Sequence, residues 1–190
     1  MKKNQMEILF VVGFVLGVVL PNILWKTELE EKGLPGLYLL TRIGPGMPAN
    51  PEYFFYVLKT RGSIYILCIL CGLSIFGLPV SVVASVWMGF LMGSVLTVSL
   101  LEFGVEGLFL AGALFLPQYI VYIPVSLTLY RRNFQISVKC WKNQKLTPQE
   151  RREYGVFCAM AAALLAVGMF LESYLNPVLI EMVVEKLHFF

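Results

Sequence analysis

The sequence predicts an all-α, polytopic membrane protein with five transmembrane helices, a cytoplasmic N-terminus and an extracytoplasmic C-terminus. Two observations carry this prediction. The 190 residues are 58% hydrophobic with a mean hydropathy of +0.75, and only 14% are charged, against about a quarter in soluble domains. Long uncharged runs also alternate with short charged segments. We therefore expect one membrane domain over residues 1–190, in contact with the lipid bilayer, rather than a soluble enzyme or a disordered or disulfide-stapled secreted chain.

The first span is expected over residues 8–25. This run is uncharged and follows Lys2 and Lys3, and about 18 helical residues approach the thickness of the hydrocarbon core. A cleaved signal peptide is the alternative. The segment from Leu20 to Trp25 lacks a small-x-small cleavage site, which favours a retained span.

Residues 26–62 are expected to form a long external loop. The segment is polar and rich in glycine and proline, with at most a short helix around Pro51–Lys59 near the interface.

Residues 63–101 carry no charge, yet one straight helix of this length would be about twice as long as the core is thick. The chain must turn back, and Gly77-Leu78-Pro79 is the strong helix breaker near the middle. We expect spans over residues 63–76 and 80–101. The first of these is short, so a tilted or partly re-entrant hairpin stays open as an alternative.

The fourth span is expected over residues 107–130, after a turn at Gly104 between Glu102 and Glu106. Pro117 and Pro124 lie within it. Each proline frees a carbonyl about one turn earlier, so a kink or break at mid-depth is predicted.

Residues 131–149 are expected to form a cytoplasmic loop. The stretch from Arg131 to Arg152 holds seven basic residues against Glu150 and Glu153. A basic cluster between apolar spans is typical of a cytoplasmic loop rather than of nucleic-acid binding, and no nucleic-acid partner is expected. Phe134, Val138 and Trp141 share a helical face, which predicts an interfacial amphipathic helix.

The last span is expected over residues 150–175. Thr147-Pro148-Gln149-Glu150 has the pattern of an N-cap, and Asn176-Pro177 is expected to end the helix before a short amphipathic tail. With five spans, Lys2 and Lys3 and the basic loop fall on the same side, as the positive-inside rule requires.

Two Gly-x-x-x-Gly pairs, Gly13/Gly17 and Gly89/Gly93, predict close helix packing. The contact is expected within the chain, and a homo-oligomer or partner interface is the alternative. Gln118 lies at membrane depth, where it can line a pathway or bond the carbonyls that the prolines free; the second is favoured. Glu172, near the outer end of its span, is expected to be solvated.

The sequence predicts no catalytic, cofactor-binding or metal-binding residues. His188 is the only histidine, and no nucleophile triad or phosphate-binding motif is present. Cys68 and Cys71 have the spacing of a redox or metal site, but they lie in an apolar span and are expected to be packing residues.

Four segments together resemble the stage II sporulation protein M family. They are Phe76–Val80 with its Gly-Leu-Pro turn, the glycine-rich Trp87–Gly93, the Pro-Gln…Ile-Pro stretch Leu116–Pro124, and Leu171–Pro177. The length, the five spans and the long first loop also fit. The family-motif and helix-packing candidates are Gly77, Pro79, Gly89, Gly93, Pro117, Gln118, Pro124, Glu172, Asn176 and Pro177.

The resemblance implies a non-enzymatic membrane scaffold of endospore formation in the mother-cell membrane at the sporulation septum. Its implied partners are the stage II sporulation proteins D, a lytic transglycosylase, and P, an amidase. They act in septal peptidoglycan remodelling and engulfment of the forespore. The alternative is a transporter or permease component, which the kinked fourth span with Gln118 favours.

Overall fold

The computed structural model describes residues 5–24 and 51–186, and each element in these ranges is an α-helix: α1 Gln5–Leu24, α3 Pro51–Gly72, α4 Gly77–Trp141 and α5 Pro148–Lys186. Four helical segments are each long and apolar enough to cross a membrane. The bent pair Phe103–Ala113 and Phe115–Trp141 makes a fifth when it counts as one span. The prediction of an all-α polytopic membrane protein is confirmed. Lys2, Lys3, His188 and most of the expected external loop lie outside the described residues.

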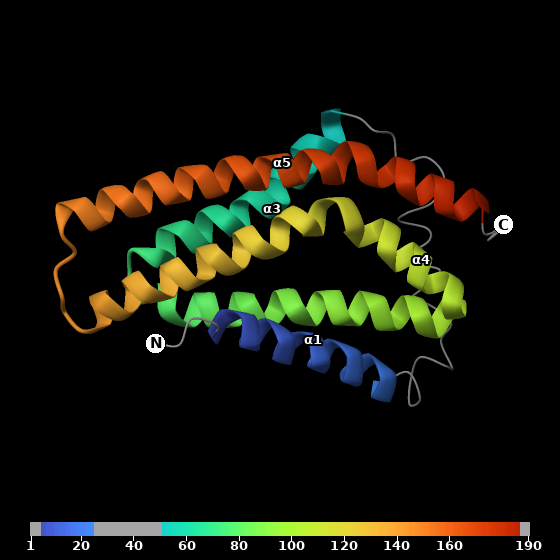
Figure 1. Ribbon diagram of the computed structural model, residues 1–190, viewed down its shortest axis with the longest axis horizontal. Helices are drawn as coiled ribbons and strands as arrows, with labels where there is room; N and C mark the ends of the chain where they lie inside the picture. The colour runs from blue at the N-terminus through green and yellow to red at the C-terminus, as the bar shows by residue number, and fades with distance from the viewer. Residues whose placement is uncertain (1–4, 25–50, 187–190) are drawn as a thin grey trace.

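The helices lie lengthwise beside one another, as Figure 1 shows. Helix α4 doubles back at Gly104, so we call residues 77–103 its first limb and residues 105–141 its return limb. Helix α1 packs on α4, while α3 packs on both α4 and α5. The turn after α3 and the loop before α5 lie at one end of the molecule, and the Gly104 turn lies at the other (Figure 1).

Helix α1 and the first limb of α4 run in the same direction, with their glycines interlocked. A Cβ atom on Gly13 or Gly17 would overlap the carbonyl oxygens of Val86 or Phe90, respectively. Side chains on Gly89 or Gly93 would in turn overlap the backbone of α1. The structure therefore places both Gly-x-x-x-Gly pairs in one close backbone contact inside the chain.

Helix α3 begins at Pro51, so the expectation of a loop up to residue 62 was wrong for its last part. Pro51 occupies the first helical position, Glu52 lies in the first turn, and an aromatic and aliphatic run follows. The polar residues Lys59 to Arg61 do not break the helix. With 22 residues α3 is about 33 Å long, enough to cross the hydrocarbon core.

The chain reverses at residues 73–76, slightly before the expected Gly77-Leu78-Pro79 turn. These three residues form the start of α4, where a proline removes no intrahelical hydrogen bond. Gly77 lies against the backbone of Gly72, and a Cβ atom there would come within 2.6 Å of the Cys71 carbonyl oxygen. The breaker thus sets where α4 begins and how closely it approaches α3.

The turn expected at Gly104 is present. Gly104 has φ 60° and ψ −140°, a conformation essentially restricted to glycine. The return limb then bends by 58° between Ala113 and Phe115. Pro117 offers no N–H to the Ala113 carbonyl four residues earlier, so the bend lies where a proline kink is expected.

The expected basic loop and interfacial helix at residues 131–149 were wrong. The return limb continues without interruption to Trp141, and only residues 142–147 connect it to α5. Phe134 packs into a core cluster around Met6 and Tyr130, and this packing extends the helix beyond the apolar span. Arg131, Arg132 and Lys139 therefore lie on α4 rather than in a loop.

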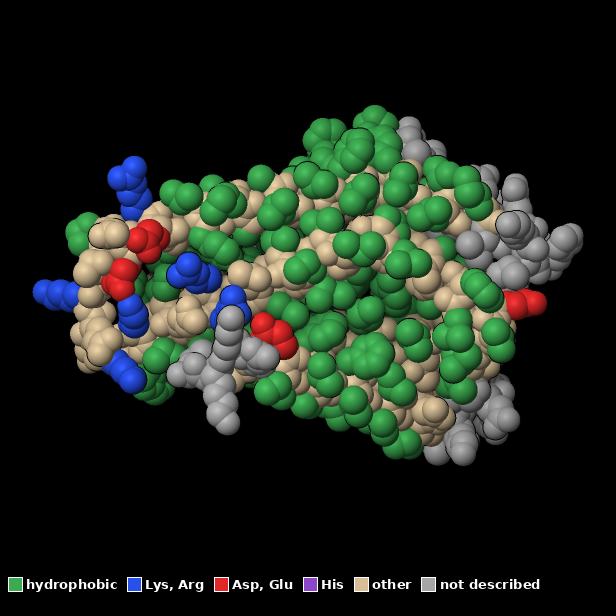
Figure 2. All heavy atoms as spheres, in the orientation of Figure 1, with side chains coloured by type: hydrophobic (Ala, Val, Ile, Leu, Met, Phe, Trp, Pro, Cys, Tyr) green, Lys and Arg blue, Asp and Glu red, His purple; other side chains and the backbone are tan. Residues whose placement is uncertain are grey.

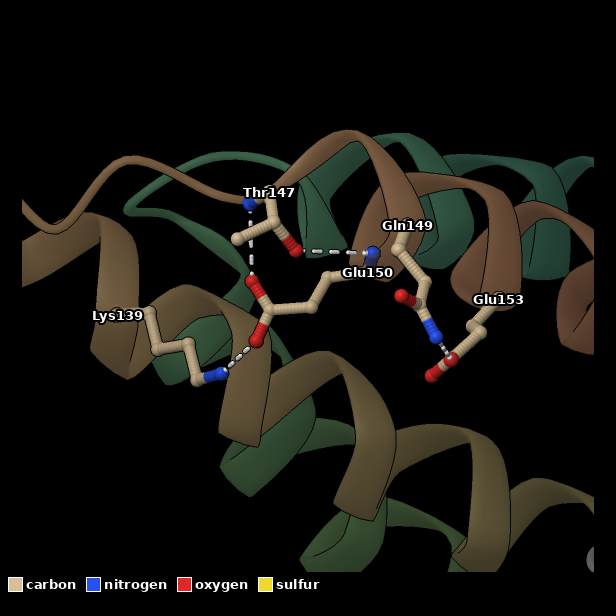
Figure 3. Close-up of polar contacts among 5 residues, drawn as sticks. All are labelled: Lys139, Thr147, Gln149, Glu150 and Glu153. Atoms are coloured by element: carbon tan, nitrogen blue, oxygen red, sulfur yellow. Dashed lines mark hydrogen bonds and ion pairs between the residues drawn. The ribbon is translucent and has the colours of Figure 1, made fainter.

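The N-cap expected at Thr147 is present (Figure 3). The Glu150 N–H donates to the Thr147 hydroxyl at 3.2 Å, and the Thr147 N–H donates to the Glu150 carboxylate at 3.0 Å. Lys139 forms an ion pair with the same carboxylate, which ties the end of the return limb to the start of α5. This reciprocal pair satisfies two backbone donors.

Helix α5 passes through Pro177 and ends at Lys186, so the expectation that Asn176-Pro177 ends the last span was wrong. An interior proline costs roughly 3 kcal/mol. Glu172, Ser173 and Asn176 are all buried on the turn before it. This packing holds the helix in place across the proline.

Candidate functional site

A buried ion pair joins α3 to α5. The Arg61 guanidinium donates to Glu172 Oε1 at 2.9 Å, although 111 positions separate the two residues in the chain. The Glu172 side chain is 9% exposed and that of Arg61 is 37% exposed. Arg61 lies at the middle of α3. Charged side chains at such depth are costly unless they are paired, which makes this pair the first candidate for a functional site.

Tyr122 adds the return limb of α4 to this pair. Its hydroxyl donates to Glu172 Oε2 at 2.8 Å, so each carboxylate oxygen has a partner. The Arg61 guanidinium also lies 5.9 Å from the centroid of the Tyr122 ring, within range of a cation–π contact. We call Arg61, Tyr122 and Glu172 the buried triad. It links three helices with charge-assisted hydrogen bonds, which are the stronger kind.

The backbone of α5 makes room for the triad at Gly168. A Cβ atom at this position would lie 2.5 Å from the Tyr122 ring, so a side chain there would displace the tyrosine. The Tyr65 ring of α3 packs on Tyr122 at a tilt, Tyr119 packs on it edge to face, and the Tyr65 and Ser126 hydroxyls form a hydrogen bond at 2.8 Å. The triad is therefore flanked by packed aromatic rings.

A second polar network lies at the C-terminal end of α3. The Asn133 amide donates to the Cys68 carbonyl at 2.8 Å, and the Tyr154 hydroxyl lies 2.9 Å from Asn133 Oδ1 and 2.8 Å from the Ile69 carbonyl. Ser137 donates to the carbonyls of the following turn. These bonds satisfy carbonyls that the end of a helix leaves without partners. Their role is structural.

A groove of about 400 Å³ opens beside the triad, between α3 and the first limb of α4. Its walls are mostly apolar, with Trp87 and Leu67 both 59% exposed. Arg61, Tyr119 and Tyr122 are among the polar residues that line it. Glu172 does not line it, so the cationic side of the triad faces this groove.

The structure brings one of the sequence candidates into the triad. Glu172 is buried and paired, so the expectation that it is solvated was wrong: α3 supplies a cation where an external loop was expected. Gln118 is 2% exposed and lies one turn before Tyr122 on the return limb. Asn176 is buried one turn after Glu172.

The other candidates belong to helix geometry rather than to the triad. Gly77, Gly89 and Gly93 are buried at backbone contacts, whereas Pro79 and Pro124 are exposed. Pro117 and Pro177 are half-buried within their helices.

Sequence reasoning missed Arg61 and Tyr122. Arg61 falls in residues 26–62, for which the polar composition and the many glycines and prolines predict an external loop. A signal was nevertheless present: an acidic residue inside an apolar helix requires a cationic partner, and the aromatic run Tyr53–Leu58 before Arg61 can continue a span.

Within residues 5–24 and 51–186, no group of three or more His, Cys or Glu side chains is arranged to hold a metal ion. All four cysteines are free, and Cys68 and Cys158 are buried. Cys68 and Cys71 lie in α3.

The family model for stage II sporulation protein M matches residues 6–177, which is most of the chain and includes every element of the triad. The chain belongs to the stage II sporulation protein M family. This family member is thus a sporulation-related multi-pass membrane protein, as the resemblance of its motifs predicted. No curated protein and no solved structure matches it.

Proposed function

We propose that this family member is a membrane scaffold of endospore formation, which recruits or positions peptidoglycan hydrolases at the sporulation septum. The match to the family over residues 6–177 carries the proposal. The scaffold acts in the mother-cell membrane, where septal wall thinning and engulfment of the forespore take place. The hydrolases are the stage II sporulation proteins D and P.

The helix packing supports a scaffold because close contacts tie the helices to one another. Backbone-to-backbone contact joins α1 to α4, and the buried triad joins α3, α4 and α5. A scaffold needs such a platform to hold partners at fixed positions, and it needs no chemistry of its own. Purified protein that cleaves peptidoglycan without partners would contradict the proposal.

The test is deletion and complementation in the sporulating organism. Deletion is expected to arrest engulfment after the septum forms, and the wild-type chain should restore it. Co-purification from sporulating cells is expected to recover both hydrolases. A deletion strain that completes engulfment normally contradicts the proposal.

A transporter or permease component is the second candidate, and the buried triad favours it. Ionisable residues inside a membrane domain often mark a pathway for ions or substrates. A charge-free version of the triad separates the two functions: Arg61→Met, Tyr122→Phe and Glu172→Leu together remove both charges and the hydroxyl while keeping similar volume. A scaffold should support engulfment with this variant, whereas a coupled transporter should lose flux.

Gln118→Leu gives an independent comparison, since Gln118 is buried outside the triad. The scaffold proposal expects normal engulfment from a variant that folds. A conduction path through the bent return limb expects lost flux. The exposed Gln135→Leu, on the same limb, is the matched control for the loss of an amide.

A further inference from the structure

A cavity of about 800 Å³ lies between the return limb of α4 and the start of α5, away from the buried triad. Arg132 reaches it from α4, and Arg152, Val156, Phe157 and Met160 line it from α5. Figure 2 shows Lys and Arg side chains gathered at this end of the molecule, with a largely apolar surface beyond them.

The cavity is net positive. Two guanidiniums and one carboxylate, that of Glu153, line it. The Glu153 carboxylate accepts a hydrogen bond from the Gln149 amide at 3.0 Å, and neither Arg132 nor Arg152 forms an ion pair with any residue in the described ranges. The neighbouring Lys139 differs, since Glu150 neutralises it (Figure 3). The two arginines can therefore bind an anion from outside the chain.

Arg132 is held in place at the cavity. Its guanidinium carbon lies 5.5 Å from the centroid of the Phe157 ring, and this contact joins the two helices. A cation–π contact does not use the N–H donors of the guanidinium, and such donors match the oxygens of a phosphate.

The lining changes from polar to apolar along α5. Gln149, Arg152 and Glu153 lie at its first turns, and Val156 and Met160 follow on the same face at helical spacing, 53% and 55% exposed. A free phosphate needs only the first part of this surface. A phospholipid needs both, because its head group lies at the interface and its acyl chains continue into the hydrocarbon.

We propose that this cavity binds the head group of an anionic phospholipid, with Arg132 and Arg152 on the phosphate and with Val156 and Met160 against the acyl chains. The ligand class is a glycerophospholipid with net negative charge. The lipid then joins the return limb to α5 at the end where the 142–147 loop connects them.

The test measures binding to the purified full chain in detergent. The probes are short-chain phosphatidylglycerol, short-chain phosphatidylcholine and glycerol phosphate without acyl chains. Tightest binding is expected for phosphatidylglycerol. Arg132→Gln and Arg152→Gln should each weaken it by about tenfold or more, the usual effect of losing a hydrogen bond to a charged group.

Arg151→Gln is the matched control. Arg151 is exposed one position before Arg152 on the same helix, but it does not line the cavity, so its loss should change affinity by less than about threefold. Circular dichroism and gel filtration check that each variant folds. If Arg132→Gln does not fold, the affinity of Arg152→Gln decides the outcome.

Three results would overturn the proposal. Equal affinity for phosphatidylcholine and phosphatidylglycerol removes the role of the negative charge. Equal affinity for glycerol phosphate and phosphatidylglycerol shows an anion site without acyl recognition. An Arg151→Gln effect as large as that of Arg152→Gln shows diffuse attraction to a basic surface rather than a site.

Discussion

Arg61 of α3 and Glu172 of α5 form an ion pair at 2.9 Å in the interior of the bundle, and Tyr122 of α4 binds the second carboxylate oxygen. The Glu172 side chain is buried, and that of Arg61 is half-buried beside the groove. Each charge is therefore tolerated only because the other is present.

Glu172→Gln should accordingly destabilise the protein, by about 1–3 kcal/mol, because it leaves the half-buried Arg61 charge without its counterion. The measurement is unfolding in detergent, by heat or by SDS titration, followed by tryptophan fluorescence. Glu153→Gln, at an exposed position of the same helix, is the control and should change little. The charge-free triple variant of the buried triad should recover most of the lost stability. If Glu172→Gln and Glu153→Gln unfold alike, the pair is not important for stability.

Gly93→Ala should loosen the contact between α1 and α4, since its Cβ atom would overlap the Phe14 carbonyl oxygen. Forcing extra atoms into a packed contact costs about 1–3 kcal/mol. Gly155→Ala is the control, because a Cβ atom there meets nothing within 4 Å. The same unfolding measurement applies. Equal stability of both variants would show that the two helices are not held at this contact.

Gly104→Ala tests the turn of α4 through the backbone alone. No atom lies within 4 Å of the added Cβ, so any loss comes from forcing alanine to φ 60°. We expect a cost of about 1–3 kcal/mol. Gly112→Ala, inside the return limb with only ordinary contact to Leu116, should be neutral or slightly stabilising. A Gly104→Ala protein as stable as Gly112→Ala would mean that the turn adopts another conformation.

Thr147→Ala removes the N-cap of α5 and should cost about 1 kcal/mol. The measurement is unfolding in detergent, as above. Gln149→Ala is the control, because it leaves the hydrogen bonds between Thr147 and Glu150 in place.

Cysteine labelling tests the orientation of the chain. In a cysteine-free background, Gln144→Cys in the 142–147 loop should react only with reagent that has access to the cytoplasm. Glu106→Cys, beside the Gly104 turn, should react from outside the cell. Both positions are exposed. The opposite pattern would show that the positive-inside rule does not set the topology of this protein.

Particular residues show how far sequence reasoning reached. The turn at Gly104, the cap at Thr147 and the proline bend were predictable, because each depends on local backbone chemistry. The start of α3 and the end of α5 were not predictable in this way. The local pattern indicates a loop at Arg61 and a helix end at Pro177. At both positions, contacts with distant residues keep the helix intact.

The sequence by itself determined the all-helical class, the membrane setting and the family. Uncharged runs and backbone breakers act over one or two helical turns, and both can be read in order along the chain. Tertiary structure decided which charges are tolerated in the interior and which glycines meet. Arg61 contacts Glu172 only because the chain reverses three times between them: at the turn after α3, at Gly104 and in the 142–147 loop. An ion pair across 111 residues leaves no periodic trace in the sequence.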